Sequence, residues 1–193
     1  EAILSGLKKD LLKNRIDTKK NQRSCFNALR RYSVYGPEFI KKTTLSNEDV
    51  ASITGEQLLG ALRDVFSKGH DFMYYGSRTK DECISTFKDV HKVNEGCVKT
   101  ARKHPEMQLT PSNRVILAQY DAKQLYYYQY SNRGEKFDLA ATPAISLYNE
   151  YFGGGMNTIV FQEMREARGL AYSAWANLST PEFKDDSYAY SAF

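Results

Sequence analysis

The sequence contains little proline and no long apolar run. Only 5 of its 193 residues are proline, while 41% are hydrophobic and 26% are charged, which excludes a disordered, collagen-like or low-complexity polypeptide. No segment approaches the roughly 18 consecutive apolar residues that cross a bilayer. Glu1 does not begin the charged, apolar and small-residue series of a signal peptide. We therefore expect a folded, globular chain without a membrane span.

Cysteine and histidine are too few and too scattered for the usual metal or nucleophile motifs. Cys25, Cys83 and Cys97 include no C-x-x-C pair, which argues against a disulfide framework and against a structural zinc site. None of the three histidines belongs to H-E-x-x-H or H-x-x-E-H, the ligand patterns of zinc peptidases, and G-x-S-x-G is absent. The sequence thus predicts neither a metal nor a catalytic nucleophile in this segment.

Nucleic-acid binding has two weak signals. Residues 1–45 contain eleven lysines and arginines against four aspartates and glutamates, a balance typical of polyanion contact but also of two solvated helix faces. Tyr126, Tyr128 and Tyr130 could stack unpaired bases, but strand alternation puts them on one face, where sheet packing is commoner. We favour the structural interpretation of both signals and expect no nucleic-acid partner.

Helical spacing and capping signals predict a largely helical first half. Leu4, Leu7 and Leu11 recur between basic residues, and Thr54 with Gln57 has the form of a capping box. In chain order we predict two helices that end at Gly36-Pro37, a short helix after Ser46, a helix from Thr54 to Gly69, a strand over Phe72–Tyr75 and a helix that begins at Thr79.

Strand patterns and further helices follow a proline-bearing stretch over about 95–113, which we interpret as an inter-domain linker. We predict a hairpin of Val115–Tyr120 with Leu125–Tyr130, helices from Thr142 to Phe152 and from Met156 to Gly169, and strands over Ala171–Leu178 and Ser187–Phe193.

The fold class expected from these elements is α+β, with helices packed on an antiparallel sheet in two layers. We divide the chain into 1–104, the C-terminal portion of one domain, and 105–193, the N-terminal portion of a related one. Because the last predicted strand has no closing helix, we expect a fragment of a longer protein.

Three consecutive glycines, Gly153, Gly154 and Gly155, separate two predicted helices. Backbone N–H groups before a helix can cradle a phosphate. However, Met156-Asn157-Thr158 stands where a Walker loop needs Gly-Lys-Ser/Thr, and no strand precedes the glycines as a dinucleotide fingerprint requires. We therefore interpret the glycines as a helix joint.

Arg165 and Tyr172 are the candidate binding residues. Arg165 lies near a predicted helix end and Tyr172 at the start of the next predicted strand, so a turn at Gly169 would bring the phenol beside the guanidinium. The guanidinium N–H groups and the phenolic O–H can donate hydrogen bonds to a peptide carbonyl, or to the oxyanion that forms when the carbonyl is attacked. The alternative is an exposed arginine at a helix C-terminus and a tyrosine packed at a strand start.

This stretch resembles the pitrilysin and insulin-degrading-enzyme family of inverted-zincin metallopeptidases, particularly its bacterial members. The matching segments are Tyr148–Phe152, the triple glycine, Phe161-Gln162, Arg165-Glu166 and Arg168-Gly169-Leu170-Ala171-Tyr172. A weaker similarity precedes these segments and begins with Gly55-Glu56-Gln57-Leu58-Leu59. The resemblance therefore covers about residue 55 to the end.

The resemblance implies a clamshell protease of related α+β domains, with zinc in one half and a second half that is usually metal-free. In this family the metal-free half contributes an arginine and a tyrosine seven positions apart, which hold the substrate carbonyl. Arg165 and Tyr172 have that spacing, and Gly153–Gly155 would shape the helix joint behind them. The implied partners are the catalytic half, in the same chain or a separate subunit, and a peptide substrate.

One departure from the family pattern defines the expected function. Because H-x-x-E-H is missing, this segment should bind no zinc and should hydrolyse no peptide alone; it should be the inactive half of a zinc endopeptidase. The alternatives are a scaffold that has lost proteolysis and a position as the second rather than the fourth clamshell domain. We also consider a homodimer of the segment, and the resemblance favours a bacterial periplasm or cell envelope.

Overall fold

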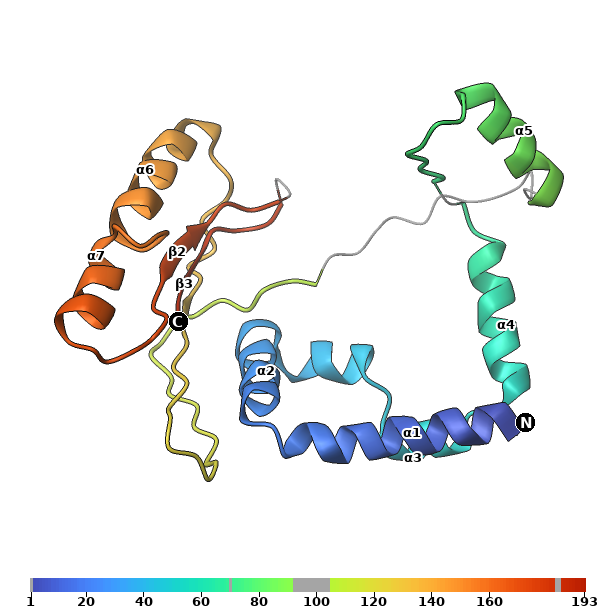
Figure 1. Cartoon of the computed structure of the whole chain (residues 1–193), viewed down its shortest axis with the longest axis horizontal. Helices are drawn as coiled ribbons and strands as arrows, with labels where there is room; N and C mark the ends of the chain where they lie inside the picture. The colour runs from blue at the N-terminus through green and yellow to red at the C-terminus, as the bar shows by residue number, and fades with distance from the viewer. Residues whose placement is uncertain (1, 70, 92–104, 183–184) are drawn as a thin grey trace. The chain divides into compact units, whose positions relative to one another are not determined.

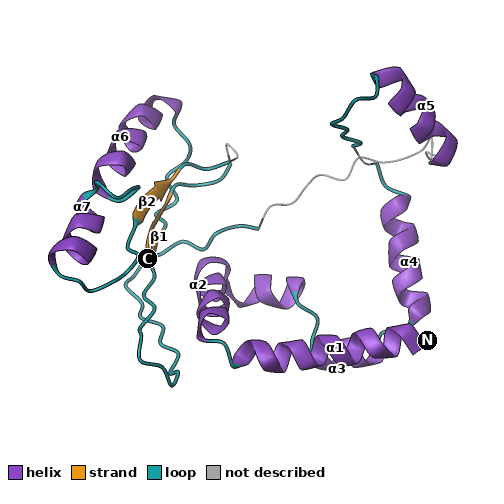
Figure 2. Cartoon of the chain, in the orientation of Figure 1, coloured by secondary structure: helices purple, strands orange, loops and turns teal. Residues whose placement is uncertain are grey.

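The computed structural model describes residues 2–69, 71–91, 105–182 and 185–193 (Figure 1). Helices and one small antiparallel sheet make up the described part, so the predicted α+β class is confirmed (Figure 2). In chain order the elements are α1 (Ala2–Lys19), α2 (Gln22–Thr43), α3 (Asn47–Ser52), α4 (Gly55–Phe66), α5 (Lys80–Val90), β1 (Gln129–Ser131), η1 (Leu139–Ala141), α6 (Thr142–Phe152), α7 (Ile159–Phe161), η2 (Gln162–Ala167), β2 (Ala176–Ser179) and β3 (Ala189–Ala192).

Contacts group these elements into two compact units. One unit is formed by 1–8 with 47–104, and the other by 9–46 with 105–193. Most of the predicted linker lies outside the described residues. Of the helices that the structure describes, none has the length and apolar character needed to cross a membrane.

The helices of the first unit begin where their capping signals predicted. At the start of α4, the Thr54 N–H donates to Gln57 Oε1 at 2.8 Å, and the Gln57 N–H donates to Thr54 Oγ1 at 3.2 Å. The same reciprocal pair opens α5, between Thr79 and Glu82. Each pair satisfies backbone donors that the first helical turn leaves without partners.

The predicted strand over Phe72–Tyr75 is wrong, because this segment is an irregular loop. The Phe72 ring packs on Phe87 of α5, with the ring centres 4.7 Å apart. The Tyr74 hydroxyl accepts a hydrogen bond from the Arg78 N–H at 3.2 Å. A β-favouring run becomes a strand only when another strand satisfies its backbone groups, and α5 does not supply such a partner.

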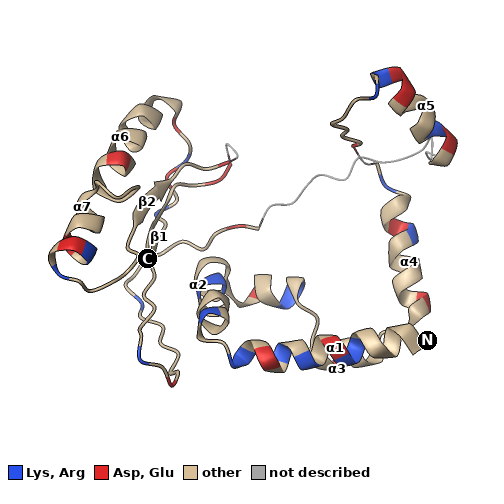
Figure 3. Cartoon of the chain, viewed as in Figure 1, with Lys and Arg blue, Asp and Glu red and all other residues tan. Residues whose placement is uncertain are grey.

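Helix α2, which belongs to the second unit, bends at Gly36. Gly36 has φ 76° and ψ 176°, so the helix stops there as predicted, but it resumes at Pro37 and continues to Thr43. Only glycine adopts this φ without strain, and proline is well suited to the first position of the resumed helix. Lys and Arg positions recur along the ribbons of α1 and α2 (Figure 3), and α1 buries none of its residues.

The sheet has the strand order β1-β3-β2, and both pairings are antiparallel. The predicted hairpin is wrong: Val115–Tyr120 forms no strand, and β1 pairs with β3 instead, with Tyr130 opposite Ser191. One face of the expected hairpin is exposed, with Leu117 at 86% and Leu125 at 88%, while Tyr126 on the other face is half-buried and stacks on Phe26. The β-propensity of these residues alone therefore does not form the predicted strand pair.

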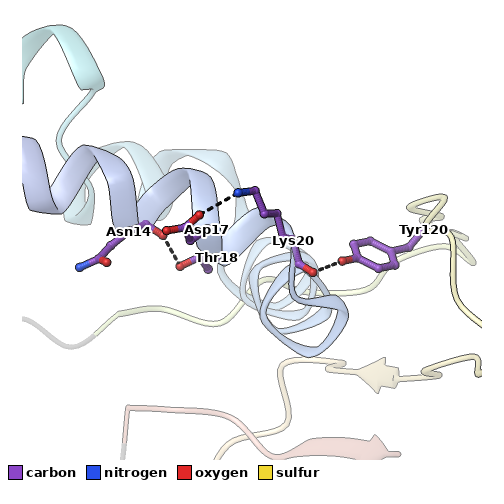
Figure 4. A network of polar contacts seen from close by, with 5 residues as sticks. All are labelled: Asn14, Asp17, Thr18, Lys20 and Tyr120. Carbon is purple, nitrogen blue, oxygen red and sulfur yellow. Dashed lines mark hydrogen bonds and ion pairs between the residues drawn. The ribbon is translucent and has the colours of Figure 1, made fainter.

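The loop before β1 is held by polar contacts with the preceding helices (Figure 4). The Tyr120 hydroxyl donates to the Lys20 carbonyl at the end of α1, and Lys20 Nζ pairs with Asp17 Oδ1 at 2.9 Å. Gln22 Nε2 donates to the Gln124 carbonyl at 2.6 Å. These contacts attach residues 120–124 to the junction between α1 and α2.

The last strands form where the sequence predicted them, although they are shorter. β2 begins at Ala176 rather than Ala171, and β3 covers Ala189–Ala192. The core of this unit lies at the sheet, where Ala176 and Ala189 are almost fully buried, and Ile145 of α6 is buried with them. Helix α6 therefore forms the layer that covers the sheet near β2.

Candidate functional site

The candidate site begins in the helical segment formed by α7 and η2. This segment ends at Gly169, where the sequence predicted a turn, and the φ of 59° is the left-handed conformation typical of a helix C-terminal cap. The Gly169 N–H donates to the Arg165 carbonyl at 3.0 Å, and the Leu170 N–H donates to the Met164 carbonyl at 2.9 Å. η2 is a π-helical turn, a feature that is frequent at functional sites. The helical segment thus ends one turn after Arg165, at Gly169.

Arg165 and Tyr172 lie together as a result of this turn. Arg165 Cζ is 4.9 Å from the centre of the Tyr172 ring and 4.9 Å from the centre of the Phe161 ring. Both distances are within the range of a cation–π interaction. Tyr172 contacts the guanidinium through its ring face. The sequence predicted Tyr172 at the start of a strand, but in the structure it lies in a loop.

Arg165 also contacts two side chains that were not predicted as site residues. Phe161, one helical turn before Arg165, supplies the second aromatic ring. Glu166 Oε1 lies 3.6 Å from Arg165 Nε and forms an exposed ion pair. The spacing of four between Phe161 and Arg165 is the signal that could have identified the ring, since side chains at this spacing meet on a helix.

The geometry of the pair leaves it open to a ligand. The Arg165 side chain is 36% exposed, and Tyr172 is 86% exposed. The two rings contact the guanidinium, and its ion pair with Glu166 is long and exposed to solvent, at 3.6 Å. A held guanidinium with an exposed phenol beside it can donate hydrogen bonds to a carbonyl or carboxylate.

The triple glycine ends α6, and its first two members are tightly packed. A Cβ on Gly153 would lie 2.6 Å from the backbone nitrogen of Ala176, which itself donates to the Gly153 carbonyl at 3.1 Å. A Cβ on Gly154 would lie 2.8 Å from the Asn149 carbonyl oxygen, whereas Gly155 has open space around it. The glycines therefore allow α6 to end directly against β2.

Two hydrogen bonds from side chains to backbone carbonyls hold the segment after the glycines. Thr158 is 2% exposed, and its hydroxyl donates to the Gly155 carbonyl at 2.6 Å. Gln162 Nε2 donates to the Met156 carbonyl at 2.9 Å. The joint between α6 and α7 is thus an ordered turn that positions the helix carrying Arg165.

Asn149 connects α6 to the outer strand β2. Its Nδ2 donates to the Leu178 carbonyl at 3.0 Å, and its Oδ1 accepts from the Leu178 N–H at 2.8 Å. The side-chain amide thereby satisfies both backbone groups of Leu178 at the sheet edge, which would otherwise remain open. Within the ranges that the structure describes, no three His, Cys, Asp or Glu side chains gather into a possible metal site.

Comparison with known proteins gives a likeness of fold. No family model matches the sequence, and no curated protein sequence matches it. Among solved structures, the chain is similar to a peptidase M16 inactive domain from Pseudomonas fluorescens, with a TM-score of 0.56 at 18% identity. The match covers 100% of this chain and 46% of that one, so the chain spans about half the length of this structural neighbour.

Proposed function

We propose that this chain is the metal-free, inactive half of a pitrilysin-like zinc endopeptidase, in which Arg165 and Tyr172 contact the peptide substrate. The observation that carries the proposal is the stacking of the Arg165 guanidinium on the exposed Tyr172 ring. The fold likeness to a peptidase M16 inactive domain supports the same function.

In this proposal the zinc site belongs to the other half, where the metal would activate water for attack on the peptide bond. The residues of this chain would bind and orient the substrate. Arg165, held between the rings of Phe161 and Tyr172, would donate to the substrate carbonyl and to the oxyanion that develops on it. Gly153–Gly155 would act indirectly, by setting where the helix that carries Arg165 begins.

We further propose that 1–104 and 105–193 are parts of two related domains. Under this division the first segment is the end of one domain and the second is the beginning of the next. Limited proteolysis of the complete protein provides the test, with cleavage expected between the two parts rather than within α6 or the sheet. Preferential cleavage inside 105–193 would contradict the division.

The zinc partnership is tested by identifying the other half. We expect an intact H-x-x-E-H either elsewhere in the complete polypeptide or in a subunit that co-purifies with it. We also expect about one zinc per complex, together with peptide hydrolysis that chelation abolishes. A complex without H-x-x-E-H, zinc or hydrolysis would instead identify a scaffold with this fold.

A further inference from the structure

The two aromatic rings that contact the Arg165 guanidinium are anchored differently. Each ring centre lies 4.9 Å from Arg165 Cζ. Phe161 is half-buried and is the last residue of α7, whereas Tyr172 is 86% exposed and lies in a loop. An exposed side chain in a loop retains more rotamer freedom than a half-buried side chain on a helix. Phe161 is therefore the more firmly placed of the two rings.

The backbone around Phe161 is fixed by hydrogen bonds within the helical segment. The Gln162 N–H donates to the carbonyl of Thr158 at 3.0 Å, and Thr158 is itself 2% exposed. The π-helical turn η2 begins directly after Phe161 and includes Arg165. Because Phe161 and Arg165 belong to consecutive turns of one segment, the distance between their backbones is set by the fold, without any ligand.

The polar contact of Arg165 is weaker than its ring contacts as a means of orientation. Glu166 Oε1 lies 3.6 Å from Arg165 Nε, and both side chains are open to solvent. An exposed ion pair of this kind constrains a long side chain little. Stacking on a ring face, in contrast, sets the plane of a guanidinium and leaves the N–H groups at its edge available. The ring of Phe161 is thus the contact best suited to orient Arg165.

We propose that Phe161 is a positioning residue, whose ring orients the Arg165 guanidinium toward the substrate carbonyl before the substrate binds. This inference rests on the proposed function, in which Arg165 donates to that carbonyl. Donors that are oriented in advance stabilise a developing oxyanion without a cost of ordering them during the reaction. Phe161 acts through Arg165, so its loss should lower kcat more than it changes KM.

The first test observes the guanidinium without any substrate. In a proton–nitrogen correlation spectrum of the 193-residue chain, the Arg165 Nε–Hε signal is identified by its loss in Arg165→Ala. Phe161→Leu should move this signal toward the positions of freely exposed arginines, and Tyr172→Leu should move it less. Phe161→Tyr keeps the ring face and should leave the signal near its original position. An unchanged signal in Phe161→Leu, or a larger shift in Tyr172→Leu, would overturn the proposal.

The second test measures peptide hydrolysis by the complete peptidase. Phe161→Leu should lower kcat about tenfold and change KM by less than about threefold, while Phe161→Tyr should retain a kcat within about threefold of the parent. Phe39→Leu is the matched control. Phe39 is also a half-buried ring beside a guanidinium, with Arg31 Cζ 5.5 Å from its centre, but it lies on α2. An equal loss of kcat in Phe39→Leu would overturn the positioning role.

A double-mutant comparison separates positioning from a general packing role. In an Arg165→Ala background, Phe161→Leu should lower kcat/KM by no more than about twofold, because the group that it orients is gone. The same loss in both backgrounds would overturn the inference. If Arg165→Ala lowers kcat/KM but Phe161→Leu does not, the positioning role fails and the proposed function stands. If Arg165→Ala leaves kcat/KM unchanged, the proposed function fails, and the positioning role fails with it even where the Arg165 signal shifts.

Discussion

The side-chain amide of Asn149 forms hydrogen bonds with both backbone groups of Leu178. Asn149 Nδ2 lies 3.0 Å from the Leu178 carbonyl oxygen, and Asn149 Oδ1 lies 2.8 Å from the Leu178 nitrogen. The amide thus satisfies the backbone groups of Leu178 that a further strand would otherwise pair with. This contact attaches α6 to the sheet, and the triple glycine follows it directly in the chain. The position of the candidate site therefore depends on a link between one helix and one strand.

Replacement of Asn149 should destabilise the second unit. Asn149→Ala removes both hydrogen bonds and leaves the Leu178 backbone groups without their partner, at a cost of about 1–3 kcal/mol in the free energy of unfolding. Urea unfolding of the 193-residue chain, followed by circular dichroism, measures the change. Glu150→Ala, at an exposed neighbouring position of α6, is the control and should differ from the parent chain by less than about 0.5 kcal/mol.

Two adjacent glycines should respond differently to the same substitution. A Cβ on Gly153 would meet the Ala176 backbone at 2.6 Å, so Gly153→Ala should force α6 away from β2 and lower the free energy of unfolding by about 1–3 kcal/mol. Gly155→Ala has open space and should be neutral or slightly stabilising. Equal unfolding midpoints for the two variants would contradict the packing described for Gly153.

The cap of α5 should make its stability depend on pH. Hydrogen bonds from the Thr79 N–H and hydroxyl lower the pKa of Glu82 below its ordinary value of 4.5. A carboxylate with a lowered folded pKa contributes stability above its unfolded pKa and loses that contribution as pH falls through the folded pKa. The difference in α5 amide protection between the parent chain and Glu82→Ala should therefore be largest near neutral pH and diminish below pH 4.5. A difference independent of pH would contradict the charged cap.

Helix ends were predictable from sequence because their determinants are local. The capping boxes at Thr54 and Thr79 and the left-handed Gly169 depend on residues within one or two turns. Strands were less predictable because they need a partner. The segment at Phe72–Tyr75 has strand-forming residues but no neighbouring strand, and β1 pairs with β3 far along the chain.

The candidate site shows the same division between local and long-range information. The proximity of Arg165 and Tyr172 follows from the turn at Gly169, and the structure brings the two side chains together. The contact of a ring face with the guanidinium was not evident from spacing alone. Nor could the sequence indicate that Gly153 packs against Ala176, because this contact exists only once α6 lies on the sheet.

The central claim is that Arg165 contacts the substrate, and the most direct test is the hydrolysis of a fluorogenic peptide by the complete peptidase. Arg165→Ala should lower kcat/KM by about 10²–10³, the usual cost of removing one transition-state donor, without changing the zinc content. Arg168→Ala is the matched control, since Arg168 is exposed at the same helix end and pairs only with Glu163 in the described structure. A smaller loss in Tyr172→Phe would accord with a supporting donor. An unchanged kcat/KM in Arg165→Ala, or an equal loss in Arg168→Ala, would contradict the assignment.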